Sequence, residues 1–292
     1  MYDRILIPTD GSDCADEAAR HAVRIAERFG SELHVLNAVE THEYVSAGNE
    51  SVERQRDIVE EEGREAVESV SETASERGVE TVEVVTYGSV HDVVLDYVED
   101  EAIDLIVMGT HGRTGFERLL LGSNAAKTVR RSEVPVFTVP SRGKDESSYV
   151  YDSILVPTDG SPGSKAAVEN AAGIARMYGS TVHVVYVIDI RIGSSTGVIP
   201  DVVTALEEEG ERATREVAGE IEEDEETEVV TDVVMGVPGR EITDYSREHG
   251  IDLIARGTHG RKGIGRLLLG STAETVIRTS EVPVLTARTR SE

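Results

Sequence analysis

The chain contains one long internal repeat, and its second copy begins near residue 150. YDRILIPTDGS at 2–12 recurs as YDSILVPTDGS at 151–161. Two further blocks recur in the same order, 102–123 as 250–271 and 130–139 as 278–287. Because the period is the size of a whole domain, the repeat indicates a tandem duplication rather than a solenoid. We predict two domains, 1–140 and 150–292, joined by a polar linker at 141–149.

Each copy alternates short apolar runs with segments of helical periodicity, which is typical of an α/β fold. The first copy predicts strands at 5–7, 33–39, 79–87, 103–108 and 134–139, and helices at 15–26, 52–77, 89–101 and 123–131. The second predicts strands at 152–158, 181–188, 228–235, 251–256 and 282–287, and helices at 163–178, 201–222, 238–249 and 271–279. We therefore expect two doubly wound domains, each a five-stranded parallel sheet with helices on both faces.

Acidic residues outnumber basic ones: the chain has 56 Asp and Glu and 29 Lys and Arg, for a net charge of −27. Nucleic acid and anionic membranes would repel such a chain, so we exclude both as partners. The low lysine content and the excess of Asp and Glu resemble the surface composition of proteins from salt-saturated cytoplasm. There molar salt shortens the Debye length to about 3 Å, which screens the repulsion among surface acids. An ordinary acidic protein is the alternative.

Membrane insertion and cysteine chemistry have little support. No apolar run reaches the ~18–20 residues of a membrane span, and the N-terminal segment lacks the features of a signal peptide. Cys14 is the single cysteine, which excludes an internal disulfide and a cysteine-based zinc site. We expect a cytoplasmic protein.

A glycine-rich loop follows the fourth predicted strand of each copy. Its spacing is G-x2-G-x9-G-S, given by Gly109, Gly112, Gly122 and Ser123, and again by Gly257, Gly260, Gly270 and Ser271. The last Gly-Ser pair opens a helix, whose free N–H groups and positive dipole end favour an anion such as phosphate. Neither copy is a Walker A loop or a G-x-G-x-x-G fingerprint after the first strand.

Charge near these loops also favours an anionic ligand. The first loop carries two basic residues, Arg113 and Arg118, and one acidic residue, Glu117. The segment 256–271 has no acidic residue, and its basic residues are Arg256, Arg261, Lys262 and Arg266. A positive island in an acidic chain fits an anion site, although solvated loop arginines are the alternative. Ligands of doubly wound sheets bind at the carboxyl ends of central strands, where Asp10 and Asp159 would meet the loops.

The complete motif, present twice and preceded by an Asp at the end of the first strand, resembles the universal stress protein family over essentially the whole chain. The resemblance implies strand order 3-2-1-4-5, dimerisation and binding of ATP or AMP. It implies that Asp10 and Asp159 hold ribose hydroxyls and that the backbone at Ala38 and Val187 addresses adenine. The motif glycines and serines would cradle ribose and phosphate.

One departure separates the copies. Met108 precedes the first glycine loop, whereas Arg256 precedes the second. An arginine beside a nucleoside could stack on adenine, reach a phosphate or narrow the pocket.

Other roles remain open for several of these residues. His111 and His259 fit backbone positioning better than acid–base catalysis, because the sequence fixes no partner beside them. Asp10 and Asp159 could cap the following helices. Ser123 and Ser271 also suit an N-cap, and Ser271 with Glu274 reads as a capping box.

These features predict an adenine-nucleotide-binding sensor or regulator, holding ATP or AMP with Mg²⁺ where a triphosphate is bound, and acting on an unidentified regulatory partner. A slow ATP hydrolase and a scaffold with vestigial pockets are the alternatives.

The terminal strands 134–139 and 282–287 begin with proline-containing segments and would be bare edges, so we expect them to pair in an intrachain pseudo-dimer. Homodimerisation beyond that is left open by the sequence.

Overall fold

The computed structural model describes residues 1–40, 50–112, 121–141, 149–192, 200–222, 227–258 and 269–288. The chain folds as two compact units, Met1–Lys144 and Asp145–Glu292. The division between them falls within the predicted linker at 141–149. Each unit has its own strands and helices.

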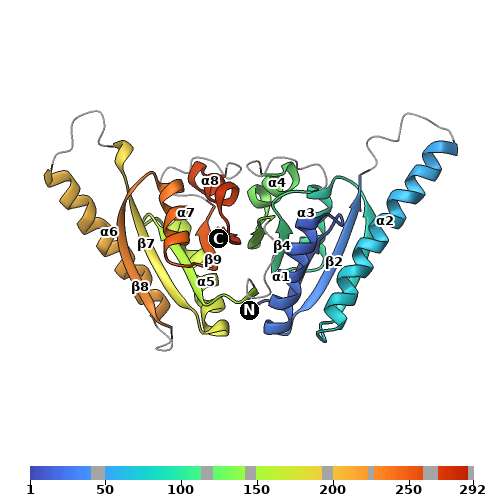
Figure 1. The fold of residues 1–292 in the computed structure, drawn as a ribbon, viewed down its shortest axis with the longest axis horizontal. Helices are drawn as coiled ribbons and strands as arrows, with labels where there is room; N and C mark the ends of the chain where they lie inside the picture. The colour runs from blue at the N-terminus through green and yellow to red at the C-terminus, as the bar shows by residue number, and fades with distance from the viewer. Residues whose placement is uncertain are drawn as a thin grey trace. The chain divides into compact units, whose positions relative to one another are not determined.

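The first unit alternates strands and helices as the sequence predicts (Figure 1). Its strands are β1 (Arg4–Pro8), β2 (Glu32–Val39), β3 (Thr81–Tyr87), β4 (Leu105–Gly109) and β5 (Val136–Val139). Its helices are α1 (Asp13–Phe29), α2 (Glu50–Ser75), α3 (Val90–Asp100) and α4 (Ser123–Arg131).

The second unit repeats this order. Its strands are β6 (Ser153–Thr158), β7 (Thr181–Asp189), β8 (Val229–Gly236), β9 (Leu253–Gly257) and β10 (Val284–Ala287). Its helices are α5 (Lys165–Tyr178), α6 (Pro200–Ile221), α7 (Pro238–Glu248) and α8 (Ser271–Thr279), and 3₁₀ turns lie at Pro162–Ser164 and Ile190–Ile192.

Strand pairing confirms the predicted fold class in both units. The described strands of the first unit pair in parallel in the order β3-β2-β1-β4-β5, and those of the second in the order β8-β7-β6-β9-β10. The register is also preserved, since Ile5 pairs with Leu105 in one unit and Ile154 with Leu253 in the other. Strand order reverses between β1 and β4, and between β6 and β9, so a crevice opens at these carboxyl ends.

Right-handed crossovers place helices on both faces of each sheet. In the first unit α1 contacts α2 and α3 contacts α4, and α2 lies along β2 (Figure 1). The second unit has the same pairs, α5 with α6 and α7 with α8. The described helices include none that is long and apolar enough to cross a membrane.

Most helix ends fall where the sequence places them. Gly30 and Gly179 close α1 and α5 with positive φ values of 69° and 74°, a conformation that glycine adopts without a steric penalty. One start differs: the helix expected from 163 begins at Lys165, because Pro162–Ser164 forms a 3₁₀ turn first. β5 begins at Val136, just after Pro135, whose carbonyl accepts from the N–H of Ile106.

The core lies between each sheet and its helices. Small alanines bring α1 close to the sheet, and Ala18 and Ala22 have no exposed surface. The central strands are apolar on both faces, as strands covered on both sides should be. Their fully buried side chains include Ile5, Leu6, Ile7, Leu105 and Ile106, and Ile154 and Leu155 in the second unit.

We expect Ile106→Ala to lower the free energy of unfolding by about 2–5 kcal/mol, because it leaves a cavity between β4 and its helices. Ile106 has no exposed surface. Ile58→Ala makes the same chemical change on α2, where the side chain is 53% exposed, and should change stability by about 0.5 kcal/mol or less. Urea titration at constant KCl measures both. Equal losses would contradict the assignment of β4 to the core.

Candidate functional site

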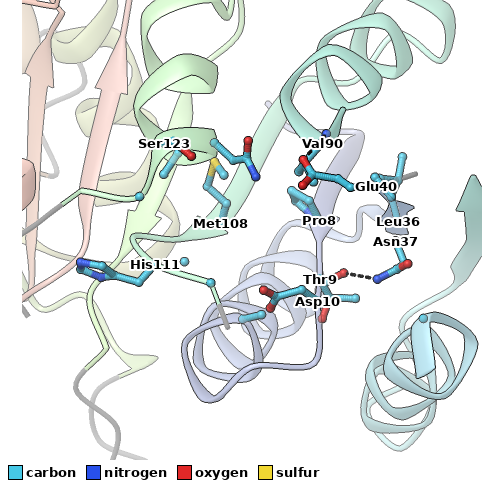
Figure 2. A pocket seen from close by; sticks show the side chains of 18 of the residues that line it. Pro8, Thr9, Asp10, Leu36, Asn37, Glu40, Val90, Met108, His111 and Ser123 are labelled. Atoms are coloured by element: carbon cyan, nitrogen blue, oxygen red, sulfur yellow. Dashed lines mark hydrogen bonds between the residues drawn. The ribbon is translucent and has the colours of Figure 1, made fainter. Parts of the chain in front are cut away.

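A cavity of about 340 Å³ opens in the first unit at the carboxyl ends of β1, β2 and β4 (Figure 2). This volume lies at the lower end of the range of small-molecule sites, about 300–1,000 Å³. Two residues of α2, one each of α1 and α3, and the start of α4 complete the wall. The cavity is lined by Pro8, Thr9, Asp10, Ala15, Leu36, Asn37, Ala38, Val39, Glu40, Val59, Gly63, Val90, Met108, Gly109, Thr110, His111, Gly112, Gly122, Ser123, Asn124 and Ala125.

The structure brings the predicted residues of the first unit together around this cavity. Segments more than one hundred positions apart in sequence meet there because β1 and β4 are neighbours in the sheet. Those that line it are Asp10, Ala38, Met108, Gly109, Gly112, Gly122 and Ser123. Arg113 lies outside the described residues.

Asp10 occupies the turn between β1 and α1. Its Oδ1 accepts the N–H of Ser12 at 3.1 Å, and the hydroxyl of Thr9 accepts the N–H of Gly11 at 3.2 Å. Ser12 is the N-cap of α1, because its side chain accepts from Ala15. Helix capping therefore falls to Ser12. A Cβ on Gly112 would lie 2.6 Å from Asp10 Oδ2, so this oxygen is turned toward the glycine loop.

Two of the loop glycines are required by packing within the protein. A Cβ on Gly109 would lie 2.9 Å from the backbone oxygen of Cys14, and one on Gly122 would lie 3.0 Å from the carbonyl oxygen of Thr110. Gly122 also donates its N–H to that oxygen at 2.8 Å. Part of the glycine spacing thus closes the loop on itself and on α1, where the sequence pattern alone had indicated only a ligand contact.

The starts of α4 and α8 correct one prediction. Their N-caps are Gly122 and Gly270, and Ser123 and Ser271 are the first helical residues, so neither serine caps its helix and no capping box forms at Ser271. A glycine has no side chain that could accept the first N–H groups. Among the described residues, no side chain caps α4, and Ser123 at its first position helps to line the cavity.

Sequence reasoning missed Asn37, Glu40 and Gly63 as lining residues. Asn37 is buried in β2 and donates from its side-chain amide to the Thr9 carbonyl at 2.8 Å. Its side-chain oxygen sits where a Cβ on Gly63 would be, so a glycine is needed inside α2. A polar residue within an apolar strand, and a glycine within a long helix, were the available signals.

His111 lines the cavity, yet its ring points away from Asp10 and Pro8 (Figure 2). Its Nδ1 lies 2.9 Å from the hydroxyl of Thr110. Burial lowers the pKa of His111, so the ring is neutral at pH 7. This geometry favours a positioning role over acid–base chemistry at the crevice.

The second unit places its predicted residues in matching positions. Asp159 Oδ1 accepts the N–H of Ser161 at 3.0 Å, as Asp10 does with Ser12. Val187 holds the position of Ala38 near the end of β7, and Gly257 ends β9. Gly270 and Ser271 open α8. Gly260 and Arg261, together with His259, lie outside the described residues.

Arg256 is the main difference in the second unit. Its Nε donates to the carbonyl of Gly257 at 3.2 Å. Burial lowers the pKa of its guanidinium to about 10, against the opposing effect of the Asp159 carboxylate.

In the part of the chain that the structure describes, no three His, Cys, Asp or Glu side chains come together as a metal site.

Comparison with known proteins agrees with the fold. A universal stress protein of Methanocaldococcus jannaschii is 38% identical over 146 residues, which cover 50% of this chain and 86% of the relative. Universal stress protein Slr1230 of Synechocystis is 25% identical over 97% of this chain and 99% of its own length. The crystal structure of a universal stress protein from Archaeoglobus fulgidus aligns with 98% of this chain and 96% of its own, at a TM-score of 0.71 and 24% identity, and supports the fold.

Family membership follows from matches that cover both units. The sequence pattern of the universal stress protein family matches residues 1–140 and again 151–288. Both copies also carry the acid after the first strand and the glycine loop after the fourth. The chain is therefore a member of the universal stress protein family with two tandem domains.

Proposed function

We propose that this protein binds an adenine nucleotide, ATP or AMP, in the first-unit crevice and acts as a cytoplasmic sensor or regulator. One observation carries the proposal: Asp10, Gly112 and the uncapped start of α4 border the same cavity. A carboxylate accepts hydroxyl hydrogens, and a helix start binds phosphate.

The residues present fit such a ligand. Asp10 Oδ2 would accept from the ribose hydroxyls, because Oδ1 is already engaged by Ser12. The N–H groups at the start of α4 would receive the phosphate, and the backbone at Ala38 would address the base. Mg²⁺, where a triphosphate binds, would neutralise phosphate charge. The orientation of His111 away from Asp10 favours binding over the alternative of slow ATP hydrolysis.

Asp10→Asn should weaken AMP binding at the first unit by about tenfold or more, because an amide N–H₂ in place of Oδ2 cannot accept a ribose hydroxyl. The Oδ1 bond to Ser12 remains, so the fold should be retained. Calorimetry gives affinity and stoichiometry together. Asp96→Asn, the same change on the exposed face of α3, is the matched control. Equal AMP affinity in the two variants would refute the role of Asp10.

Substitution of Gly122 is a poorer test. A Cβ there would press on the Thr110 carbonyl at 3.0 Å, so the loop itself would shift. Loss of binding in Gly122→Val would combine exclusion of the phosphate with this strain.

We further propose that the protein is adapted to high salt. Helix α2 illustrates the reason, because exposed acids follow one another along it while Arg64 pairs with Glu61 and with the half-buried Glu60. Its exposed acids are Asp57, Glu61, Glu62, Glu65, Glu68 and Glu72. Such pairs contribute little stability, so unscreened repulsion among the remaining acids should dominate at low salt.

The thermal midpoint should therefore rise from low to molar KCl, as screening relieves repulsion among the acids. Melting curves over a KCl series measure this. A midpoint that stays flat or falls would contradict the halophilic interpretation.

The mutual arrangement of the two domains stays a prediction from the sequence. Pairing of the terminal strands, 134–139 with 282–287, would cover two otherwise bare edges and form an intrachain pseudo-dimer. Small-angle scattering of the full chain should then fit one compact particle. A profile of two independent beads would exclude that pairing.

A further inference from the structure

The two crevices differ at the residue that precedes the glycine loop. Met108 pairs with Thr138, and Arg256 pairs with Thr286 at the same register of the second unit. Met108 is buried and lines the first cavity. Figure 2 shows its side chain between Ser123 and Pro8. The second unit thus places a cation where the first has an uncharged thioether.

Arg256 has unused hydrogen-bonding capacity. Its Nε is engaged by the carbonyl of Gly257. Its Nη1 is buried and has no hydrogen-bond partner among the residues that the structure describes. A guanidinium has five N–H donors and no acceptor, and leaving a buried one without a partner is costly. An anionic ligand group would remove this cost.

Neighbouring groups indicate where such an anion would lie. The Asp159 carboxylate raises the pKa of the Arg256 guanidinium against the larger effect of burial, so the two charged groups lie near each other. Asp159 itself lies in the turn after β6, where its Oδ1 accepts the N–H of Ser161. Gly270, the N-cap of α8, has no side chain to cap the first N–H groups of that helix. Two independent anion-binding features therefore flank the same loop: Arg256 lies at the end of β9, before the loop, and the uncapped start of α8 follows it.

We propose that Arg256 recognises an anionic group directly and makes the second crevice selective for phosphate-bearing ligands over the corresponding nucleosides, a selectivity that the first crevice lacks at Met108. The proposal rests on the proposed nucleotide function for the ligand class. The anion contact itself is argued from Arg256 together with the start of α8, and it does not depend on the nucleotide assignment. A charge-assisted hydrogen bond to a buried guanidinium is also screened less by salt than a surface contact.

The test compares AMP with adenosine in the full chain carrying Asp10→Asn, which weakens the first site. Arg256→Met installs the residue of the first unit, so folding should be retained. We expect AMP affinity at the second site to fall about tenfold or more while adenosine affinity is unchanged. Arg256→Lys should recover part of the loss. Arg215→Met, an exposed charge removal on α6, is the control and should leave both affinities unchanged.

Two calorimetric outcomes would overturn the proposal. Equal losses for AMP and adenosine would mean that Arg256 stacks on the base. Tighter binding of both ligands would mean that it narrows the pocket.

Inorganic phosphate gives a readout that does not depend on the nucleotide assignment. At constant ionic strength set with KCl, phosphate should raise the thermal midpoint of the parent chain more than that of Arg256→Met. If AMP binds nowhere but this difference remains, the proposed function fails and the anion site stands. If AMP binds and neither readout depends on Arg256, the anion site fails and the proposed function stands.

Discussion

The close approach of Gly109 to the backbone of Cys14 fixes the geometry of the first crevice. Gly109 ends β4 and Cys14 lies in the first turn of α1, and no side chain larger than hydrogen fits between them. This contact holds the loop after β4 beside the turn after β1. Asp10 and Gly112 meet as a consequence, and Gly122 donates its N–H to the Thr110 carbonyl. The crevice thus arises from packing constraints within the protein itself.

Sequence periodicity predicted most of the fold because its signals are local. Apolar runs marked the strands, Gly30 and Gly179 marked helix ends, and the repeat supplied each element twice. The predictions that failed depend on details of one or two hydrogen bonds. Ser123 is a residue type that favours the N-cap, yet the N-cap is Gly122. Its N–H donates to the Thr110 carbonyl, and a Cβ there would lie 3.0 Å from that oxygen.

The cavity wall was only partly predictable for a related reason. Residues next to a motif, such as Asp10 and Met108, could be found because the motif fixes their position. Asn37 and Gly63 come from β2 and α2 and match each other only in three dimensions, where the amide oxygen fills the space that a Cβ would need. A single sequence does not display such a pair, although each residue is unusual in its own element.

The two copies keep the same strand order and turns but differ in the side chains at positions that line the first cavity. The second unit keeps the strand order, the Asp turn and the glycine N-cap, all of which are backbone features. Several positions that line the first cavity differ in side chain. Arg256 stands for Met108, and Tyr186 stands for Asn37 and packs against Gly210 of α6. Backbone constraints permit such exchanges, since they act through glycines and strand register. Tandem copies in one chain can therefore evolve different ligand preferences without losing the fold.

A net charge of −27 is unfavourable for binding a phosphate, and the architecture suggests how the conflict is resolved. Repulsion by the acidic surface acts over the Debye length, about 8 Å at physiological ionic strength and about 3 Å in molar salt. Helix N–H groups and a buried guanidinium act at hydrogen-bond distance, where salt screens them much less. High salt would thus remove the repulsion that keeps an anion away and leave intact the contacts that hold it. On this argument, an acidic exterior and an anion-binding crevice are compatible as long as the crevice binds through short-range donors.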